Sequence, residues 1–147
     1  MLTIVPSRTA TSELASELRV SLMRLARRLR AERLDEGLTP TQLAVLGTLD
    51  RHGPMTLGEL AAHEKVQPPS MTRTTAILEE RRLVTRVTQE VDRRQVRIAI
   101  SDAGLALLRE DRKRRDAWLA GRFDQLTSDE RALLHRVAPL LDRLAQS

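Results

Sequence analysis

The sequence predicts a mainly α-helical fold with one small β-hairpin, in the order α-α-α-α-β-β-α-α. Three observations support this prediction. Leucines recur at helical spacing near both ends of the chain, helix-capping motifs divide its middle, and one stretch near residue 95 alternates apolar and polar side chains as a strand does. The chain has 147 residues, 41% hydrophobic and 31% charged, which is enough for a single domain with a core.

The first two helices are indicated by a leucine stripe and by a capping motif. A helix over about residues 12–32 explains a row of leucines spaced three or four residues apart: Leu14, Leu18, Leu22, Leu25 and Leu29. A second helix over about 40–51 begins at a capping box, with Thr39 as N-cap, Pro40 in the first position and Gln42 in the third.

The remaining elements follow the same logic. Thr56 and Glu59 repeat the capping pattern after Gly53-Pro54, which end the preceding helix. Ser101 can cap a helix directly after the second strand. The expected elements are helices over about 56–62 and 67–81, strands over 83–88 and 95–100, and helices over about 102–122 and 128–145.

The third and fourth helices have the spacing of a helix-turn-helix. Ala61 is small enough to let two helices cross closely, and Val66, five residues later, can fill the turn between them. In that motif the second helix enters the major groove of DNA.

The outward face of this second helix suits DNA. Its first turns contain short hydroxyl side chains, no acids, and Arg73, which can reach guanine. The helix N-terminus is expected to add free N–H groups and a positive dipole end for a phosphate. A plain surface helix is the alternative for this segment alone. The candidate DNA-contacting residues are Gln67, Pro68, Pro69, Ser70, Thr72, Arg73 and Thr74.

The tip of the hairpin is basic and lacks the Gly, Pro or Asn of a tight turn. It contains Asp92-Arg93-Arg94. A helix-turn-helix followed by a basic hairpin predicts a winged helix, whose wing reaches the minor groove, where a narrow groove favours arginine. We expect Arg93, Arg94 and Arg97 to contact DNA and Asp92 to form an intramolecular salt bridge.

The distribution of charge agrees with this interpretation. Residues 65–97 contain eight basic and four acidic residues, which leaves +4 of the net +5 in one window. A mixed-charge solvated surface would spread the excess evenly. The concentrated charge therefore favours a polyanionic partner, double-stranded DNA.

At these residues the chain resembles the MarR family (multiple-antibiotic-resistance regulators). The resemblance runs from about Ser12 to Leu144 and includes residues 38–46, 56–61 and 78–84. Its most specific element is Asp92-Arg93-Arg94, which matches the family's wing signature. The resemblance implies a winged-helix homodimer that binds pseudo-palindromic DNA, most often as a repressor released by a small phenolic or aromatic acid ligand.

The resemblance also implies roles for single residues. Arg94 would be the minor-groove arginine and Asp92 its structural partner. Two places depart from the family, which usually has Gly where this chain has Arg82 and often has Asp-Pro and a variable residue where this chain has Gln89-Glu90-Val91. A left-handed backbone at Arg82 would cost about 1 kcal/mol relative to Gly.

Dimerisation is also expected from the residues themselves. The leucine stripes of the first and sixth helices would leave an apolar patch exposed on a monomer, and packing them against a second copy would bury it. Two-fold symmetry would then place two recognition helices about 34 Å apart, one turn of DNA. We therefore expect one domain over 1–147, with a winged helix-turn-helix lobe at about 38–100 and dimerisation helices at about 10–34 and 102–147.

Several other functions find no support in the sequence. Without cysteine there is no disulfide, thiol catalysis, thiol redox sensing or cysteine zinc site. His52, His63 and His135 lack metal-ligand spacing, and no nucleophile elbow or phosphate-binding loop is present. We expect no enzyme activity, no cofactor and no metal. With neither a signal peptide nor a membrane span, the expected location is the cytoplasm.

Two functions remain open. One is a ligand-responsive transcription regulator, and the other is a DNA-binding architectural protein without an effector. For the first, the family's architecture would place a pocket near Arg27, His52 and Trp118, although core or surface roles for each of them are an alternative.

Overall fold

The computed structural model describes residues 8–33, 37–88 and 95–146, and it confirms the mainly helical fold class. The predicted helices and both strands of the hairpin are present, and the first helix begins at Arg8 rather than near residue 12. In these residues the order is α1 (Arg8–Ala31), α2 (Pro40–His52), β1 (Met55–Thr56), α3 (Leu57–Glu64), α4 (Pro68–Glu80), β2 (Val84–Thr88), β3 (Val96–Ile100), α5 (Asp102–Phe123) and α6 (Ser128–Gln146).

The sheet has three antiparallel strands rather than the two of the predicted hairpin. Its order is β1-β3-β2, so β3 lies in the middle. The hairpin register pairs Val84 with Ile100 and Thr88 with Val96. On the other side of β3, Met55 pairs with Ile98, which connects the wing directly to the start of α3.

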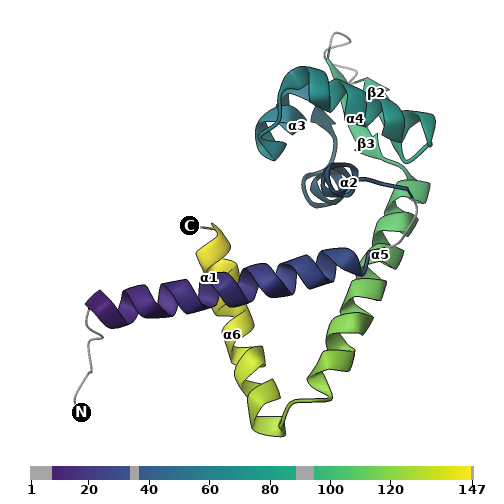
Figure 1. The fold of residues 1–147 in the computed structure, drawn as a ribbon. Helices are drawn as coiled ribbons and strands as arrows, with labels where there is room; N and C mark the ends of the chain where they lie inside the picture. Colours follow the sequence, from purple (N-terminus) through teal and green to yellow (C-terminus); the bar gives the residue numbers. More distant parts are fainter. Residues whose placement is uncertain (1–7, 34–36, 89–94, 147) are drawn as a thin grey trace. The chain divides into compact units, whose positions relative to one another are not determined.

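The chain divides into two compact units. One is Arg33–Lys113, and the other combines Met1–Glu32 with Arg114–Ser147, so the boundary falls inside α5. Figure 1 shows α2, α3 and α4 gathered beside the strands of the first unit. Every buried hydrophobic residue of the described chain belongs to that unit: Leu38, Val45, Leu46, Leu49, Leu60, Ala61, Met71, Leu78, Leu83, Val84, Ile98 and Leu108.

The turn between α3 and α4 has the expected packing. Ala61 is buried, and Val66 is partly buried against the core. Lys65 adopts the left-handed conformation, with φ of 54°. The amide of Val66 donates to the Ala61 carbonyl, and the amide of Lys65 donates to the Ala62 carbonyl. These two bonds form a Schellman motif, which ends α3 sharply and starts the chain toward α4.

A second Schellman motif ends α4, again without glycine. Arg82 has φ of 58°, the left-handed conformation considered from the sequence. The amides of Arg82 and Leu83 donate to the carbonyls of Glu79 and Leu78, at 2.9 Å each. Because Leu78 and Leu83 are both buried, their packing accompanies the turn and offsets the cost of a side chain at this position.

The start of α5 lies against this turn. Ser101 Oγ donates to the Arg82 carbonyl at 2.7 Å and accepts from the Gly104 amide at 3.0 Å, which confirms Ser101 as a cap. A β-carbon at Gly104 would lie 2.1 Å from the Leu83 carbonyl oxygen. Only glycine therefore allows α5 to approach the end of α4 so closely.

Candidate nucleic-acid interface

The α4 helix presents most of the predicted recognition residues to solvent. Met71, Thr75 and Leu78 hold the opposite face of α4 in the core, which fixes the orientation of the helix. Thr74 is half-buried at the edge between the two faces. The exposed residues are Gln67, Pro68, Pro69, Ser70, Thr72 and Arg73.

The first turn of α4 corrects one expectation. No pair of free N–H groups is available there, because Pro68 and Pro69 have no amide hydrogen. The next two amides, of Ser70 and Met71, both donate to the Gln67 carbonyl, at 3.0 and 3.1 Å. What remains of the anion site is the helix dipole, without amide donors from the first four residues of α4.

Among the described residues, Arg73 lacks the acidic partner that two other arginines of this unit have. Arg86 is paired with Glu79 at 2.8 Å, and Arg97 is paired with Glu59 at 3.4 Å. Arg73, in contrast, is exposed and has no ion pair within the described part of the chain. The first turn of α4 has no acidic residue, so nothing there opposes a phosphate or competes for Arg73.

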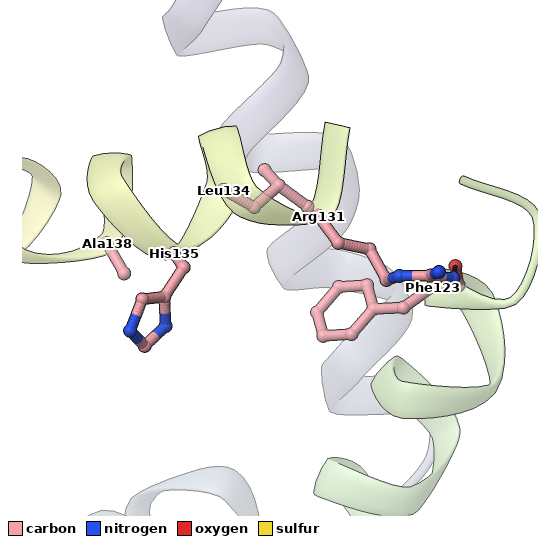
Figure 2. Close-up of a pocket in the computed structure, with 5 residues that line it drawn as sticks. All are labelled: Phe123, Arg131, Leu134, His135 and Ala138. Carbon is pink, nitrogen blue, oxygen red and sulfur yellow. Dashed lines mark hydrogen bonds between the residues drawn. The ribbon is translucent and has the colours of Figure 1, made fainter. Parts of the chain in front are cut away.

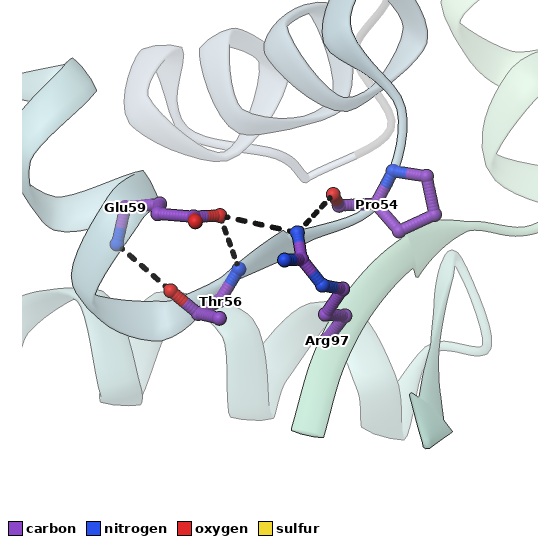
Figure 3. A network of polar contacts seen from close by, with 4 residues as sticks. All are labelled: Pro54, Thr56, Glu59 and Arg97. Atoms are coloured by element: carbon purple, nitrogen blue, oxygen red, sulfur yellow. Dashed lines mark hydrogen bonds and ion pairs between the residues drawn. The ribbon is translucent and has the colours of Figure 1, made fainter. Parts of the chain in front are cut away.

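Arg97 lies in a network that sequence reasoning missed. Its Nη1 donates to the Pro54 carbonyl at 3.2 Å and to Glu59 Oε2 at 3.4 Å (Figure 3). The same Glu59 oxygen accepts from the Thr56 amide at 3.0 Å in the capping box of α3. Arg97 therefore joins the central strand of the wing to the start of the helix-turn-helix.

The other wing residues lie outside the described residues. These are Asp92, Arg93 and Arg94. The described strands end at Thr88 and begin again at Val96.

The candidate ligand residues fall into both units. Arg27 is exposed on α1, and Trp118 is half-buried on α5. The guanidinium groups beside the Trp118 ring are those of Arg28 and Arg122, at 5.6 and 4.9 Å from its centroid, and neither had been expected there. These distances are within the range of cation–π contacts.

His52 lies in the other unit, where it meets a second histidine. The rings of His52 and His63 are 5.1 Å apart, and His63 Nδ1 is 3.6 Å from Glu64 Oε1. No three His, Asp or Glu side chains of residues 8–33, 37–88 and 95–146 are placed to hold a metal ion. The described helices include none that is long and apolar enough to cross a membrane.

A cavity of about 340 Å³ lies where α5 turns into α6 (Figure 2). Its apolar walls are Phe123, Leu134 and Ala138, with His135 and Arg131 beside them. Arg131 Nη1 donates to the carbonyls of Phe123 and Leu126, at 3.2 Å each, so this guanidinium also holds the turn. No motif in the sequence had indicated this cavity, because it depends on how two helices meet.

Comparison with known proteins supports the winged-helix interpretation. The model of the MarR family matches residues 38–96. An HTH-type transcriptional regulator of Mycobacterium leprae is 42% identical over 130 residues, covering 88% of this chain and 91% of the relative. The HTH-type transcriptional repressor MdtR of Bacillus subtilis is 30% identical over 142 residues, covering 94% and 90%.

Solved structures agree in fold. A protein of Pseudomonas aeruginosa described as a transcriptional regulator matches with a TM-score of 0.82 and 34% identity, covering 97% of this chain and 99% of that one. A mutant of S. aureus MepR, solved bound to an oligodeoxyribonucleotide, matches with a TM-score of 0.68 and 19% identity, covering 90% and 96%. The second likeness is one of fold alone.

Proposed function

The chain belongs to the MarR family, and on that premise we propose that it is a homodimeric repressor of pseudo-palindromic operators, released by a small aromatic or anionic ligand. Its family and relatives make it a DNA-binding transcription regulator with a winged helix, a class without enzymatic activity. Because such a regulator acts on the chromosome, we also propose that it works in the cytoplasm.

The exposed face of α4 is the observation that carries the DNA-binding role. Arg73 lies on this face and has no ion pair in the described chain. The first turn of α4 has no acidic residue, and the opposite side of the helix is buried in the core. We propose that Gln67, Ser70, Thr72 and Arg73 face base edges and phosphates in the major groove, with Pro68, Pro69 and Thr74 beside them.

The wing completes the proposed interface. Arg93 and Arg94 would enter the minor groove, with Asp92 fixing the loop. For Arg97 we propose a positioning role, because its hydrogen bonds go to Pro54 and Glu59. A wing attached to the helix-turn-helix would present its arginines at a fixed distance from α4.

The two chain ends are proposed as the dimerisation region. Neither α1 nor α6 has a buried residue, although both carry many large apolar side chains. Leu14, Leu133 and Leu144 are 55%, 56% and 67% exposed, respectively. An apolar surface of this kind on a monomer is unusual, and a second copy with the same surface would cover it through an isologous contact. We thus propose one dimerising module from about 10–34 and 102–147 and a DNA-binding lobe at about 38–100.

Repression and ligand release rest on separate support. The similarity to the repressor MdtR over most of both chains favours repression. For a ligand, the cavity at Phe123 falls within the range of about 300–1,000 Å³ that small-molecule sites occupy. Trp118, with the guanidinium groups of Arg28 and Arg122 beside it, is a second candidate. We propose Arg27, which precedes Arg28 in the chain, and His52 as further candidates.

The second candidate function is an architectural DNA-binding protein without an effector. The two candidate functions are distinguished by isolating genomic fragments bound by the protein and then adding small aromatic acids to the complexes. Release of a few specific fragments supports the ligand-responsive repressor. Binding that shows no sequence preference and no release supports the architectural protein.

Salt dependence tests DNA binding itself. Each neutralised phosphate contributes a slope of about −0.9 in log K against log salt, so a dimer with several cationic contacts should show roughly −5 to −9. A slope shallower than about −2 would contradict the proposed interface.

A further inference from the structure

Thr72 lies on the exposed face of α4, but its hydroxyl is hydrogen-bonded to the backbone of the helix. Thr72 Oγ1 donates a hydrogen bond to the Pro68 carbonyl one turn earlier, at 3.0 Å. The side chain is nevertheless exposed. Because a hydroxyl has a single hydrogen, Thr72 cannot also donate to a base while this bond is present.

The inward bond limits what Thr72 can recognise. Guanine and adenine N7, guanine O6 and thymine O4 are acceptors in the major groove, and each needs a donor. With its hydrogen used, Thr72 offers its γ-methyl group and the two acceptor lone pairs of its oxygen. A methyl group is the natural partner of the thymine 5-methyl, which projects into the same groove.

The neighbours of Thr72 strengthen its apolar character. Pro69 and Ala76 lie three residues before and four residues after it, hence on the same face of α4, and both are exposed. Neither has a side-chain hydrogen-bonding group. The adjacent Arg73 is the charged donor of this surface, and the first acids of the helix come only at Glu79 and Glu80.

From these contacts we propose that Thr72 recognises a thymine through its methyl group, so that it is a specificity-determining residue whose hydroxyl serves the helix rather than the DNA. The proposal rests on the proposed role of α4 in the major groove. Arg73 and Thr72 then have separate tasks, with Arg73 reading guanine acceptors and Thr72 reading the thymine 5-methyl.

The test uses the full-length protein and a duplex enriched from a random pool by the wild-type chain. Each thymine of that duplex is replaced in turn by deoxyuridine, which removes only the 5-methyl group. At the thymine that Thr72 contacts, the replacement should weaken wild-type binding about fourfold per half-site, the factor expected for burying one apolar carbon. Other positions should change little.

Two variants separate the methyl from the hydroxyl. Thr72→Val keeps the methyl that would contact the thymine and loses only the hydroxyl, so it should retain affinity within about twofold and keep the sensitivity to deoxyuridine. Thr72→Ser keeps the hydroxyl and loses the methyl, so it should bind the thymine duplex about fourfold less tightly per half-site and lose that sensitivity. Thr41→Ser, at an exposed threonine of α2, is the matched control and should change neither.

The opposite pattern overturns the proposal. If Thr72→Val weakens binding more than Thr72→Ser, the hydroxyl reads the DNA, and if no deoxyuridine position matters to the wild type, no thymine methyl is read. A wild-type chain that enriches no sequence contradicts the proposed sequence-specific function, and the thymine assignment fails with it. Thermal melting of each variant distinguishes lost recognition from lost folding.

Discussion

Arg97 on β3 and Glu59 on α3, 38 residues apart in the chain, form an ion pair with 3.4 Å between Nη1 and Oε2. The pair joins the wing to the helix that precedes α4, the proposed recognition helix. Glu59 is also the third residue of the α3 capping box, so one carboxylate serves both the local cap and the long-range link.

The first prediction separates these two tasks. Glu59→Gln should keep the capping bond to the Thr56 amide, because Gln serves equally well in a capping box, but it loses the charge that holds Arg97. We expect weaker DNA binding, since a released wing must be ordered on binding, and a stability loss below about 1 kcal/mol for this exposed pair. Fluorescence anisotropy and thermal melting measure the two effects.

The control is Glu80→Gln, which removes the same charge from an exposed acid of α4. Simple electrostatics predicts that both variants bind DNA more tightly, because each removes a negative charge. If Glu59→Gln does so, Arg97 is better explained as a direct DNA contact.

A second prediction concerns the left-handed residue after α4. Arg82→Gly should stabilise the fold by up to about 1 kcal/mol, because glycine adopts a φ of 58° without steric cost. Arg81→Gly is the matched control: Arg81 has φ of −80°, so the same change gives no relief there and should destabilise. Chemical denaturation measures the free energy of unfolding of both variants. Equal effects would show that left-handed strain at Arg82 does not cause the change in stability.

Gly104 gives a third prediction, with a control in the same helix. Gly104→Ala would force a β-carbon against the Leu83 carbonyl, so the start of α5 must shift, and we expect a loss of more than about 2 kcal/mol in the free energy of unfolding. Gly121→Ala meets no atom within 4 Å and should gain about 0.5–1 kcal/mol from helix propensity. Two alanine variants of the same sign would contradict this account.

The fourth prediction distinguishes the two proposed arginine contacts. Arg73→Ala should weaken binding to the enriched duplex more than to unrelated DNA, because bidentate pairing with guanine discriminates by about 1–3 kcal/mol. Arg94→Ala should weaken both duplexes alike, because a minor-groove arginine reads width and A·T content. Titrating both variants on both duplexes gives the ratio, and a reversed ratio would exchange the two roles.

The fifth prediction is a dimer held by the chain ends. Sedimentation at micromolar concentration should give twice the 16.6 kDa chain mass. Replacing Leu133 and Leu140 by Lys should shift the protein to monomer, because charges cannot be buried unpaired in an apolar interface. Gln125→Lys, at an exposed position before α6, is the control and should leave the dimer intact. A double-lysine variant that remains dimeric would exclude α6 from the interface.

Local signals predicted the starts of α2, α3 and α5 correctly. The capping bonds of Thr39, Thr56 and Ser101 connect residues at most three apart, so the sequence itself contains both partners. Pro68 and Pro69 at the start of α4 can also be read directly from the sequence. The expectation of free amides there is wrong because Pro68 and Pro69 have no amide hydrogen.

Other features could not be predicted because they depend on tertiary contacts. Met55 and Thr56 form a strand only because β3 lies beside them, and two residues carry no pattern of their own. The ion pair between Arg97 and Glu59 and the contact between His52 and His63 likewise join separate elements. The candidate ligand residues Arg27, His52 and Trp118 are divided between the two units, and the arginines beside Trp118 are Arg28 and Arg122.

The paired prolines at the start of α4 have a consequence for how the protein would discriminate among DNA sequences. Two consecutive fixed φ angles stiffen the end of the helix that we propose to meet the duplex, so less motion would be lost when a complex forms. The same residues remove the amides through which a helix end grips any phosphate, whatever the sequence around it. Beyond the helix dipole, affinity at this end of α4 would then come from side chains and from groove shape, which would increase the difference in affinity between a correct site and random DNA and shorten the time spent on wrong sites.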